Sequence, residues 1–409
     1  MHLKLHHAQV NKASKITISG SKSESNRLLL LQALYPKIKI TNLSNSDDSQ
    51  VMQNALSGQA NVIDIHHAGT AMRFLTAYFA TQPQKEVVLT GSERMKERPI
   101  KILVDALKSL GAHITYLENE GCPPLKILGK ELVKDKVTLN ANVSSQYISA
   151  LLLVAPKLKN GLELTLKGEI TSVPYIKMTL SLLEQIGVKT TFKDNIITIS
   201  PKPSLDNEID IVVESDWSSA SYFYSILALS PVGTKITLAS YNANSLQGDS
   251  VLATIYEQFG VQTQFKSHTI TLEKTAEVMF KKGIELNLVN CPDIAQTIAV
   301  TCFGLGVSCE LTGLHTLRIK ETDRLQALKN ELEKLGGELT ITNESLTLQP
   351  SKEMRPNTAI ETYNDHRMAM AFAPLALKTA LVIKDAAVVT KSYKAFWDDL
   401  KQLGFKVSQ

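Results

Sequence analysis

Two kinds of predicted helix alternate along this chain at regular intervals, and this repetition limits the folds that it can adopt. Helices of the first kind end in an apolar residue followed by glycine, which is a common C-terminal cap. These glycines are Gly111, Gly187, Gly260, Gly336 and Gly404, and successive ones lie 68 to 76 residues apart. A nearly constant interval of this kind indicates an internally repeated fold.

The second kind of predicted helix is strongly apolar and opens on a polar segment. Six such openings lie at residues 25–27, 69–73, 144–146, 218–221, 293–296 and 365–367. Segments of alternating apolar and polar residues, such as 87–91 and 162–166, follow these helices and are predicted strands. The sequence therefore predicts an α/β fold made of six βαβαββ repeats, with sheets that helices cover on one face.

The last repeat is one predicted strand short, because only a short segment follows Gly404. The alternating N-terminal segment 2–6 is able to complete that sheet and pair its edge. This predicts a discontinuous domain of residues 1–15 plus 215–409 and an inserted domain of residues 16–214, with three repeats in each. Several helix N-termini would then direct free N–H groups and positive dipole ends into the cleft between the domains, where we expect the active site.

Composition excludes several classes of function. The 44 Lys and Arg residues nearly balance the 40 Asp and Glu residues, and a net charge of +4 does not indicate nucleic acid as the main partner. No apolar segment is long enough to cross a bilayer and no signal-peptide pattern opens the chain, so we expect a cytoplasmic protein. The four cysteines show no CxxC spacing, so we expect reduced thiols and neither a zinc site nor a disulfide framework.

Arginine is used sparingly and in clusters. Only eight of the 44 basic residues are arginine, and seven of these eight fall within residues 22–27, 69–98, 318–324 and 365–367. Since the planar guanidinium group makes bidentate contacts with phosphates and carboxylates, these clusters predict binding of anionic ligands. Ion pairing on helix surfaces is the alternative, but it does not explain why arginine is used in place of the abundant lysine.

The first apolar helix illustrates the arrangement. Ser25 or Asn26 is predicted to cap it, which places Lys22, Ser23 and Arg27 around a helix N-terminus that favours an anion. Ordinary capping beside a solvated lysine is the alternative for this segment taken alone.

Two further charged segments adjoin predicted helix starts. Gly69 permits close approach of a ligand to the backbone, and Pro99, directly after Arg98, is predicted near the first position of a helix. Thr322 or Asp323 is able to cap a helix that begins near Arg324, as an alternative to a binding role. A solvated helix face is the alternative for charged runs of this type.

Taken together, six segments resemble the motifs of the 5-enolpyruvylshikimate-3-phosphate (EPSP) synthase family, in the same order along the chain. They are residues 20–27, 68–73, 95–100, 144–146, 320–324 and 364–367. The resemblance implies a monomer of two domains, each an inside-out α/β barrel of three repeats. It also implies transfer of the enolpyruvyl group of phosphoenolpyruvate to the 5-hydroxyl of shikimate 3-phosphate, with release of phosphate and without a metal or cofactor.

The same resemblance implies two overlapping sets of binding residues. For shikimate 3-phosphate they are Lys22, Ser23, Arg27, Ser144, Ser145, Gln146, Ser172, Asp293, Thr316 and Lys320. For phosphoenolpyruvate they are Lys22, Gly69, Arg98, Gln146, Arg324, Arg367 and Lys391. Tyr175 is expected to pack or hydrogen-bond near the ligand.

The implied reaction needs an acid and a base, because a carbon atom gains a proton while a hydroxyl group loses one on the way to a tetrahedral intermediate. Asp293 and Glu321 are the candidates for these steps, and the sequence does not decide which carboxylate performs which. Lys22 is a candidate catalytic cation, and Lys391 a charge stabiliser or proton carrier. His366 is a weaker candidate, since its position also suits a helix cap.

Five positions depart from the family pattern. His67, Phe74, Lys101, Thr316 and Lys394 stand where Asn, Pro, Gly, Asn and Pro are common. Because these positions flank the segments expected to bind phosphoenolpyruvate, they bring into question the affinity for that substrate and for the inhibitor glyphosate, but not the reaction.

Two other functions were weighed against this one. The related enolpyruvyl transferase that acts on UDP-N-acetylglucosamine usually carries a cysteine in the loop near residues 94–98, where this chain has none. A phosphate- or nucleic-acid-binding repeat protein without catalysis would need basic stripes interleaved with aromatic side chains, and aromatic residues make up only 6% of the chain. The EPSP synthase interpretation is preferred, and with it a closure of the two domains on ligand binding.

Overall fold

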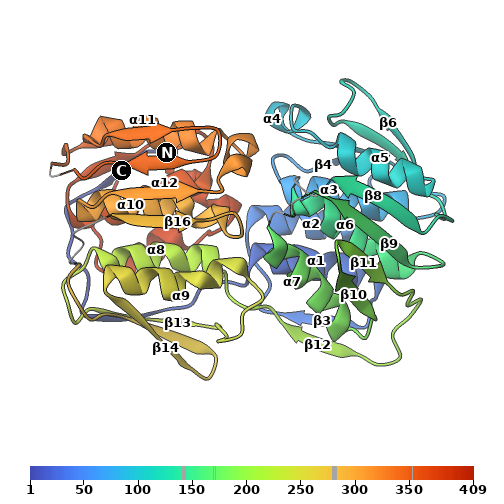
Figure 1. Ribbon diagram of the computed structural model, residues 1–409, viewed down its shortest axis with the longest axis horizontal. Helices are drawn as coiled ribbons and strands as arrows, with labels where there is room; N and C mark the ends of the chain where they lie inside the picture. The colour runs from blue at the N-terminus through green and yellow to red at the C-terminus, as the bar shows by residue number, and fades with distance from the viewer. Residues whose placement is uncertain (141–143, 169, 171, 279–282, 352) are drawn as a thin grey trace. The chain divides into compact units, whose positions relative to one another are not determined.

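The computed structural model describes residues 1–140, 144–168, 170, 172–278, 283–351 and 353–409 (Figure 1). The chain forms two compact units. The terminal unit consists of Met1–Gly20 and Glu214–Gln409, and the inserted unit consists of Ser21–Val213. The crossover lies at Gly20 rather than at residue 15, because strand β2 (Ala13–Ile16) pairs in parallel with β13 (Lys235–Ala239) and so remains in the terminal unit.

The described part of the inserted unit alternates helices with short strands. Its α-helices are α1 (Lys22–Leu34), α2 (Asp47–Ser57), α3 (Gly69–Ala80), α4 (Glu93–Lys96), α5 (Lys101–Leu110), α6 (Ser145–Val154) and α7 (Val173–Gln185), and a 3-10 turn, η1 (Ala155–Lys157), follows α6. Its strands are β3 (Ile38–Thr41), β4 (Val62–Asp64), β5 (Glu86–Thr90), β6 (His113–Tyr116), β7 (Leu125–Leu128), β8 (Lys136–Asn140), β9 (Leu162–Lys167), β10 (Thr190–Lys193), β11 (Ile196–Ile199) and β12 (Ile209–Val212).

The terminal unit has the same alternation. Its helices are α8 (Trp217–Ala228), α9 (Leu252–Ile255), α10 (Ala295–Leu305), α11 (Arg324–Leu335), α12 (His366–Phe372) and α13 (Phe396–Gln402), with 3-10 turns η2 (Gly248–Val251), η3 (Tyr256–Phe259), η4 (Pro292–Ile294), η5 (His315–Ile319), η6 (Ala373–Leu377) and η7 (Ala386–Lys391). Besides β2 and β13, its strands are β1 (Leu3–Leu5), β14 (Val261–Lys266), β15 (Thr269–Lys274), β16 (Ile284–Asn287), β17 (Cys309–Thr312), β18 (Leu339–Ile341), β19 (Leu346–Leu348), β20 (Thr358–Ile360), β21 (Leu381–Ile383) and β22 (Val407–Ser408).

Most of the strands join in small mixed sheets with a common pattern. Within the described residues, five sheets have four strands each, in the orders β20-β21-β1-β22, β14-β15-β13-β2, β16-β17-β19-β18, β10-β11-β9-β8 and β4-β5-β7-β6. Each contains one parallel pair, such as β8 with β9, and two antiparallel pairs. The predicted α/β class is confirmed, because the parallel neighbours in four of these five sheets are connected through one helix.

The inserted unit departs from the expected repeat after its second helix. The parallel pair β3 and β12 forms a sheet of only two strands. Helix α2 is followed directly by β4, which belongs to another sheet, and only residues 58–61 lie between them. This connection is too short for the two further strands that the sequence pattern predicted.

Apolar helices form the centre of each unit. In the terminal unit α8, α10 and α12 pack against one another (Figure 1), and all residues of α8 are buried. In the inserted unit α1, α3 and α6 pack together in the same way. Each fully buried leucine on these helices contributes about 2 kcal/mol through removal of its side chain from water. Among the described residues, no helix combines the length and the apolar character that crossing a membrane requires.

Candidate active site

The first turn of α1 carries the polar residues that open the inserted unit. The predicted cap at Ser25 or Asn26 is wrong, because the helix already begins at Lys22 and Ser21 occupies the N-cap position. The Ser25 hydroxyl instead accepts a hydrogen bond from the backbone N–H of Ser44, 2.9 Å away. Lys22 and Ser23 therefore lie in the first turn, where anions are favoured.

Arg27 lies one turn further along α1 and is almost fully buried. Its guanidinium group donates to the hydroxyls of Thr179 (2.8 Å) and Ser149 (2.9 Å) and to the carbonyl oxygen of Ser23 (2.7 Å). Burial lowers the pKa of Arg27 to about 10, with Tyr175 acting in the opposite direction. The buried guanidinium group of Arg27 therefore holds the backbone carbonyl group of Ser23. The ring of Tyr175 packs on the guanidinium group, with 5.9 Å between Cζ and the ring centroid.

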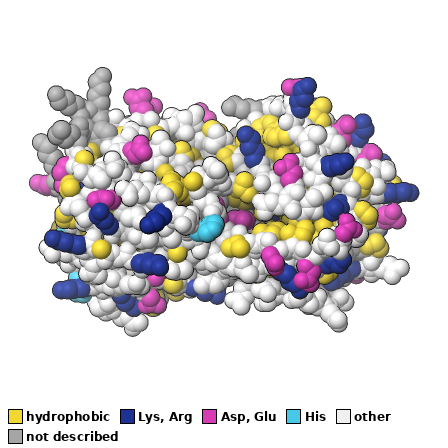
Figure 2. All heavy atoms as spheres, turned by 90° about the horizontal axis from the view of Figure 1, so that it is seen from below, with side chains coloured by type: hydrophobic (Ala, Val, Ile, Leu, Met, Phe, Trp, Pro, Cys, Tyr) yellow, Lys and Arg dark blue, Asp and Glu magenta, His cyan; other side chains and the backbone are white. Residues whose placement is uncertain are grey.

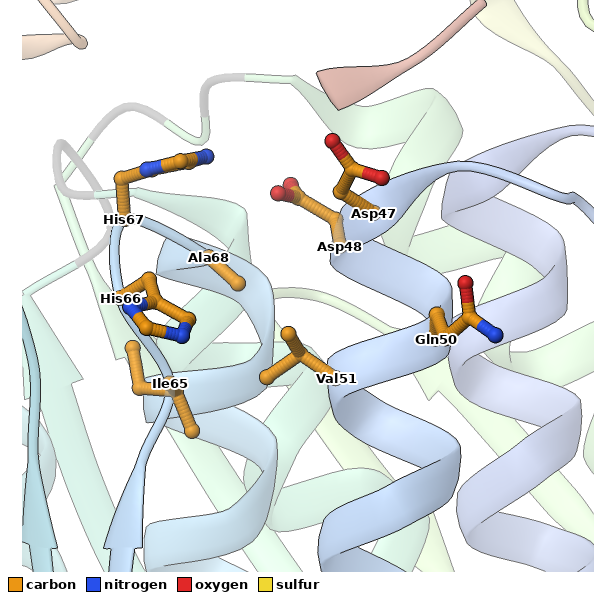
Figure 3. Close-up of a pocket in the computed structure, with 8 residues that line it drawn as sticks. All are labelled: Asp47, Asp48, Gln50, Val51, Ile65, His66, His67 and Ala68. Atoms are coloured by element: carbon orange, nitrogen blue, oxygen red, sulfur yellow. The ribbon is translucent and has the colours of Figure 1, made fainter. Parts of the chain in front are cut away.

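Lys22 forms an ion pair with Asp48 of α2, with 3.0 Å between Nζ and Oδ2. Asp48 also lines a pocket of about 290 Å³ in the inserted unit (Figure 3). In Figure 3 the carboxylates of Asp47 and Asp48 lie across this pocket from His66 and His67. His67, one of the departures from the family pattern, therefore lines the same pocket as Asp48, the ion-pair partner of Lys22.

Gly69 and Arg98 bring a helix start and a guanidinium group together in the inserted unit. Gly69 is the first residue of α3, and Ala68 at the N-cap position offers no side-chain cap. A Cβ atom on Gly69 would lie 2.6 Å from Nη1 of Arg98, so the guanidinium rests directly on the glycine. The Nε atom of Arg98 is buried without a hydrogen-bond acceptor among the described residues. A helix N-terminus and an arginine therefore adjoin each other there.

The segment that carries Arg98 differs from the sequence prediction. Pro99 was expected near the first position of a helix, but α5 begins at Lys101, with Ile100 at its N-cap position. The carbonyl oxygen of Pro99 accepts hydrogen bonds from Arg73 (2.8 Å) and from the hydroxyl of Tyr147 (2.6 Å). Tertiary contacts therefore hold Pro99 outside the helix.

Helix α6 brings a second polar helix start to Gly69. Ser144 caps α6 by accepting from the backbone N–H of Gln146, and Ser145 is the first residue of the helix. The Gln146 side chain donates to the hydroxyl of Thr70, 3.2 Å away, and so joins the first turns of α6 and α3. Ser172 precedes α7 in a left-handed conformation (φ 54°) and is buried, while the neighbouring residues 169 and 171 lie outside the described part of the chain.

In the terminal unit, three carboxylates surround Arg324. Its guanidinium group contacts Asp293 (2.9 Å), Glu321 (2.8 Å) and Asp365 (2.6 Å), and its side chain is 2% exposed. Burial acts to lower the pKa of Arg324, but the carboxylates outweigh it and the pKa is raised. Asp323, one of the two predicted candidates, caps α11 by accepting from the backbone N–H of Gln326.

Asp293 is the shared acceptor of this cluster. Arg367 contacts its Oδ2 at 3.3 Å and Lys320 its Oδ1 at 3.5 Å, in addition to Arg324. Burial acts to raise the pKa of Asp293, yet Arg367, Lys320 and Arg324 together hold it well below its usual range. The residue lies in the 3-10 turn η4, not in the first turn of α10, which begins at Ala295.

Helix α12 and the loop before it complete the cluster. Asp365 caps α12 by accepting from the backbone N–H of Arg367, 2.9 Å away, while its other oxygen holds Arg324. Tyr363 and Asn364 are both left-handed, with φ of 52° and 55°. The carbonyl oxygen of Asn364 accepts from Nζ of Lys391 at 2.5 Å. Lys391 is thus held to the loop that precedes α12.

The structure thus groups the expected site residues into two clusters, one in each unit. The cluster in the inserted unit contains Lys22, Ser23, Arg27, Gly69, Arg98, Ser144, Ser145, Gln146 and Ser172. The cluster in the terminal unit contains Asp293, Thr316, Lys320, Glu321, Arg324, Arg367 and Lys391. The hydroxyl of Thr316 is buried without a partner in the described part of the chain, and a ligand would satisfy it. On the face drawn in Figure 2, Lys and Arg side chains are interspersed with Asp and Glu.

Sequence reasoning missed several partners of these residues. Asp48 and Asp365 bind the predicted cations, and Ser218 accepts from Arg367 at 3.3 Å. The sequence analysis did not single out Asp48, and it considered Asp365 only as part of a helix start and a possible cap. Among the described residues, no group of three or more His, Cys, Asp or Glu side chains is arranged to hold a metal ion.

Comparisons with known proteins show similarity to one enzyme family. Residues 53–400 match the family model of EPSP synthase (3-phosphoshikimate 1-carboxyvinyltransferase). The 3-phosphoshikimate 1-carboxyvinyltransferase of Bacteroides fragilis is 47% identical over 96% of this chain and 95% of its own length. The corresponding enzyme of Haemophilus influenzae is 38% identical, with 96% of each chain covered.

Solved structures give the same fold. An EPSP synthase from Acinetobacter baumannii superposes with a TM-score of 0.81 at 21% identity, over 100% of both chains. The enolpyruvyl transferase NikO from Streptomyces tendae superposes with a TM-score of 0.74 at 14% identity, over 100% of this chain and 98% of its own.

Proposed function

The chain belongs to the EPSP synthase family, and we propose that both of its clusters of charged residues act in that family's reaction. The enzyme transfers the enolpyruvyl group of phosphoenolpyruvate to shikimate 3-phosphate and releases phosphate. The proposal concerns which residues bind each substrate and which move the protons.

The observation that carries the proposal is the contact between Arg98 and Gly69. The buried Nε atom of Arg98 has no acceptor among the described residues, and its guanidinium group lies against the N-terminus of α3. The N-cap residue of α3 offers no side-chain cap. This arrangement favours binding of an anion. We assign this position to phosphoenolpyruvate, with Lys22 and Gln146 beside it. Gln146 is placed by its hydrogen bond to Thr70 in the first turn of the same helix.

Shikimate 3-phosphate is assigned to the starts of α1, α6 and α7. Ser144, Ser145 and Ser172 offer hydroxyls at helix N-termini, and a phosphate accepts from such groups and from free backbone N–H groups. Ser23 lies in the first turn of α1 over the buried charge of Arg27. From the terminal unit, Thr316, Lys320 and Asp293 are assigned to the ring hydroxyls.

Arg324, Arg367 and Lys391 of the terminal unit are assigned to phosphoenolpyruvate. Arg324 and Arg367 pair with carboxylates in the free enzyme, so an incoming phosphate or carboxylate competes with Asp293 and Glu321 for them. When substrate draws these cations away, the carboxylates lose the charges that suppress their basicity. Substrate binding thereby prepares both groups for proton transfer.

We assign the 5-hydroxyl proton to Asp293 and protonation of the methylene carbon to Glu321. Asp293 is ionised in the free enzyme, because three cations lower its pKa, and it can accept a proton once these have turned to the substrate. Glu321 takes up a proton once Arg324 has turned to the substrate, and it passes this proton to the methylene carbon while the hydroxyl oxygen attacks, which gives a tetrahedral intermediate. Phosphate then leaves with the proton held by Asp293, and the methyl group returns its proton to Glu321 as the double bond forms. Lys22 stabilises the negative charge on the substrates throughout.

A phosphate-release assay tests the function. We expect release only when phosphoenolpyruvate and shikimate 3-phosphate are both present, and none when either is omitted. Release with UDP-N-acetylglucosamine in place of shikimate 3-phosphate would assign the enzyme to the related transferase class. Release from phosphoenolpyruvate alone would indicate simple hydrolysis and contradict the proposed transfer.

A further inference from the structure

A buried carboxyl group that the proposed reaction does not use lies close to Arg367. Asp249 belongs to the turn η2 and is 3% exposed. Its Oδ2 accepts a hydrogen bond from the hydroxyl of Ser218, while its Oδ1 is buried with no hydrogen-bond partner among the described residues. A buried oxygen in this situation costs free energy, so its retention calls for an explanation.

Ser218 connects this carboxyl group to the substrate-binding cluster. A serine hydroxyl has a single proton, and Ser218 donates it to Asp249. The oxygen of the same hydroxyl is therefore turned toward Arg367, and it accepts from Nη2 at 3.3 Å. That Nη2 atom also lies 3.3 Å from Oδ2 of Asp293. Asp249 thus determines which way the Ser218 hydroxyl points, and with it one of the acceptors that orient Arg367.

The surroundings of Asp249 are crowded with charge. Asp216 caps α8 by accepting from the backbone N–H of Ser218. Cys291 and Asp293 approach Asp249 from the η4 segment, and Arg367 approaches it from α12. Burial raises the pKa of Asp249 to about 7; Asp293 and Asp216 add to this effect, and Arg367 opposes it. Protonation near neutral pH therefore removes a negative charge from beside Arg367.

We propose that Asp249 is a positioning residue for phosphoenolpyruvate, which acts through the Ser218 hydroxyl on the guanidinium group of Arg367. The inference rests on the proposed function, because it takes Arg367 as a phosphoenolpyruvate ligand. Asp249 contacts Ser218 and not the substrate, so its effect belongs to binding of one anionic substrate rather than to the chemical step. Binding of shikimate 3-phosphate, which is assigned to other residues, is not expected to depend on Asp249.

Two substitutions separate the contributions of geometry and charge. In Asp249→Ala the Ser218 hydroxyl is free to rotate and Arg367 loses a fixed acceptor, so we expect KM for phosphoenolpyruvate to rise about tenfold, as loss of one charge-assisted hydrogen bond predicts. The turnover number and KM for shikimate 3-phosphate should change less than about twofold. Asp249→Asn keeps an acceptor oxygen without the charge, so it should restore KM to the value that the wild type shows with Asp249 protonated, below about pH 7, and should abolish the change of KM with pH.

Asp399→Asn is the matched control. Asp399 is a partly buried carboxyl group of the same unit, it accepts from the hydroxyl of Tyr393 at 2.6 Å, and burial raises its pKa as well. It has no contact with Arg367, so this variant should leave KM for phosphoenolpyruvate unchanged. Thermal unfolding of every variant checks that the fold is intact, and Ser218→Ala breaks the same link if Asp249→Ala does not fold.

The outcomes are distinct. A rise in KM for phosphoenolpyruvate alone, reversed by asparagine, supports the role of Asp249. Equal changes in both KM values, no change, or the same KM in the alanine and asparagine variants would overturn it while leaving the enzyme's function intact. Absence of phosphate release by the wild-type enzyme would overturn the proposed function and this inference with it.

Discussion

At the scale of single residues, the two clusters hold their cations in opposite ways. In the inserted unit Arg27 donates to hydroxyls and a carbonyl oxygen, and Arg98 rests on Gly69. In the terminal unit Arg324 is neutralised by three carboxylates. An anion can therefore bind at Arg98 without displacing a carboxylate, whereas at Arg324 it must compete with the three carboxylates.

Gly69→Ala tests the proposed anion site at Gly69 and Arg98. Its Cβ would lie 2.6 Å from Arg98 Nη1, so the guanidinium must move off the start of α3. We expect KM for phosphoenolpyruvate to rise by about tenfold or more, with a smaller effect on shikimate 3-phosphate. In an Arg98→Lys background, where the clashing group is absent, the added effect of Gly69→Ala should shrink. Full additivity of the two substitutions in steady-state kinetics would contradict the steric argument.

Asp293→Asn tests the shared carboxylate by its dependence on pH. Because its folded pKa lies below the unfolded value, Asp293 stabilises the fold above about pH 4, and this contribution is lost as the pH falls further. The variant should unfold at a lower temperature than the wild type near neutral pH. The difference should narrow as the pH falls below about pH 4, because the Asp293 carboxylate then becomes protonated in the unfolded chain while it is still ionised in the folded protein. Turnover should fall by about a hundredfold or more if Asp293 accepts the hydroxyl proton.

At the scale of secondary-structure elements, the ends of the helices carry most of the polar interactions. The five predicted C-cap glycines all adopt positive φ, which explains why glycine recurs there. A distant side chain also satisfies carbonyl groups at two of the helix ends. Lys274 on β15 is fully buried, and its Nζ donates to the carbonyl oxygens of Ala228 at the end of α8 (2.9 Å) and Phe259 at the end of η3 (2.7 Å).

Lys274→Met should therefore destabilise the terminal unit. Methionine preserves the apolar stem but leaves two buried carbonyl oxygens without a donor, which costs about 2–4 kcal/mol. The expected result is a lower denaturant midpoint in equilibrium unfolding. Lys266→Met, on the exposed end of the same hairpin, is the control and should have little effect. An unchanged midpoint for Lys274→Met would show that the two carbonyl groups find other partners.

At the scale of the whole molecule, the terminal unit is assembled from both ends of the chain. Strand β1 lies between β21 and β22 and pairs with both in antiparallel register, with Leu5 opposite Leu381 and Val407. Leu3 and Leu5 are buried in the core of this unit. The N-terminal strand is thus an interior strand of a sheet whose other members come from the last fifty-odd residues of the chain.

Removal of residues 1–6 should consequently affect only one unit. It leaves β21 and β22 without their common partner and removes Leu3 and Leu5, whose burial contributes about 2 kcal/mol each. We expect faster amide hydrogen exchange in β20, β21 and β22, with little change in α1, α3 and α6. Lys4→Ala, which alters the exposed side chain of the same strand, is the control. Equal acceleration in both units would mean that the sheet does not depend on β1.

Local sequence patterns predict the α/β class, the capping glycines of the repeated helices and the membership of the family, and they narrow the cap of α11 to Thr322 or Asp323. Periodicity and capping depend on neighbours within a few residues, so a sequence records them directly. The site residues assigned from the family resemblance remain proposals that the kinetic experiments test.

Only the tertiary structure decided the start of α1 at Lys22, the two-stranded sheet in the inserted unit and the partners of the charged residues. Arg324 and Asp365 lie 41 residues apart in sequence and 2.6 Å apart in space, and Ser218 and Asp249 are joined across 31 residues. Such pairs depend on how helices and turns pack, which no local pattern encodes. The folded chain therefore decides whether a charge is free to bind a substrate or already neutralised.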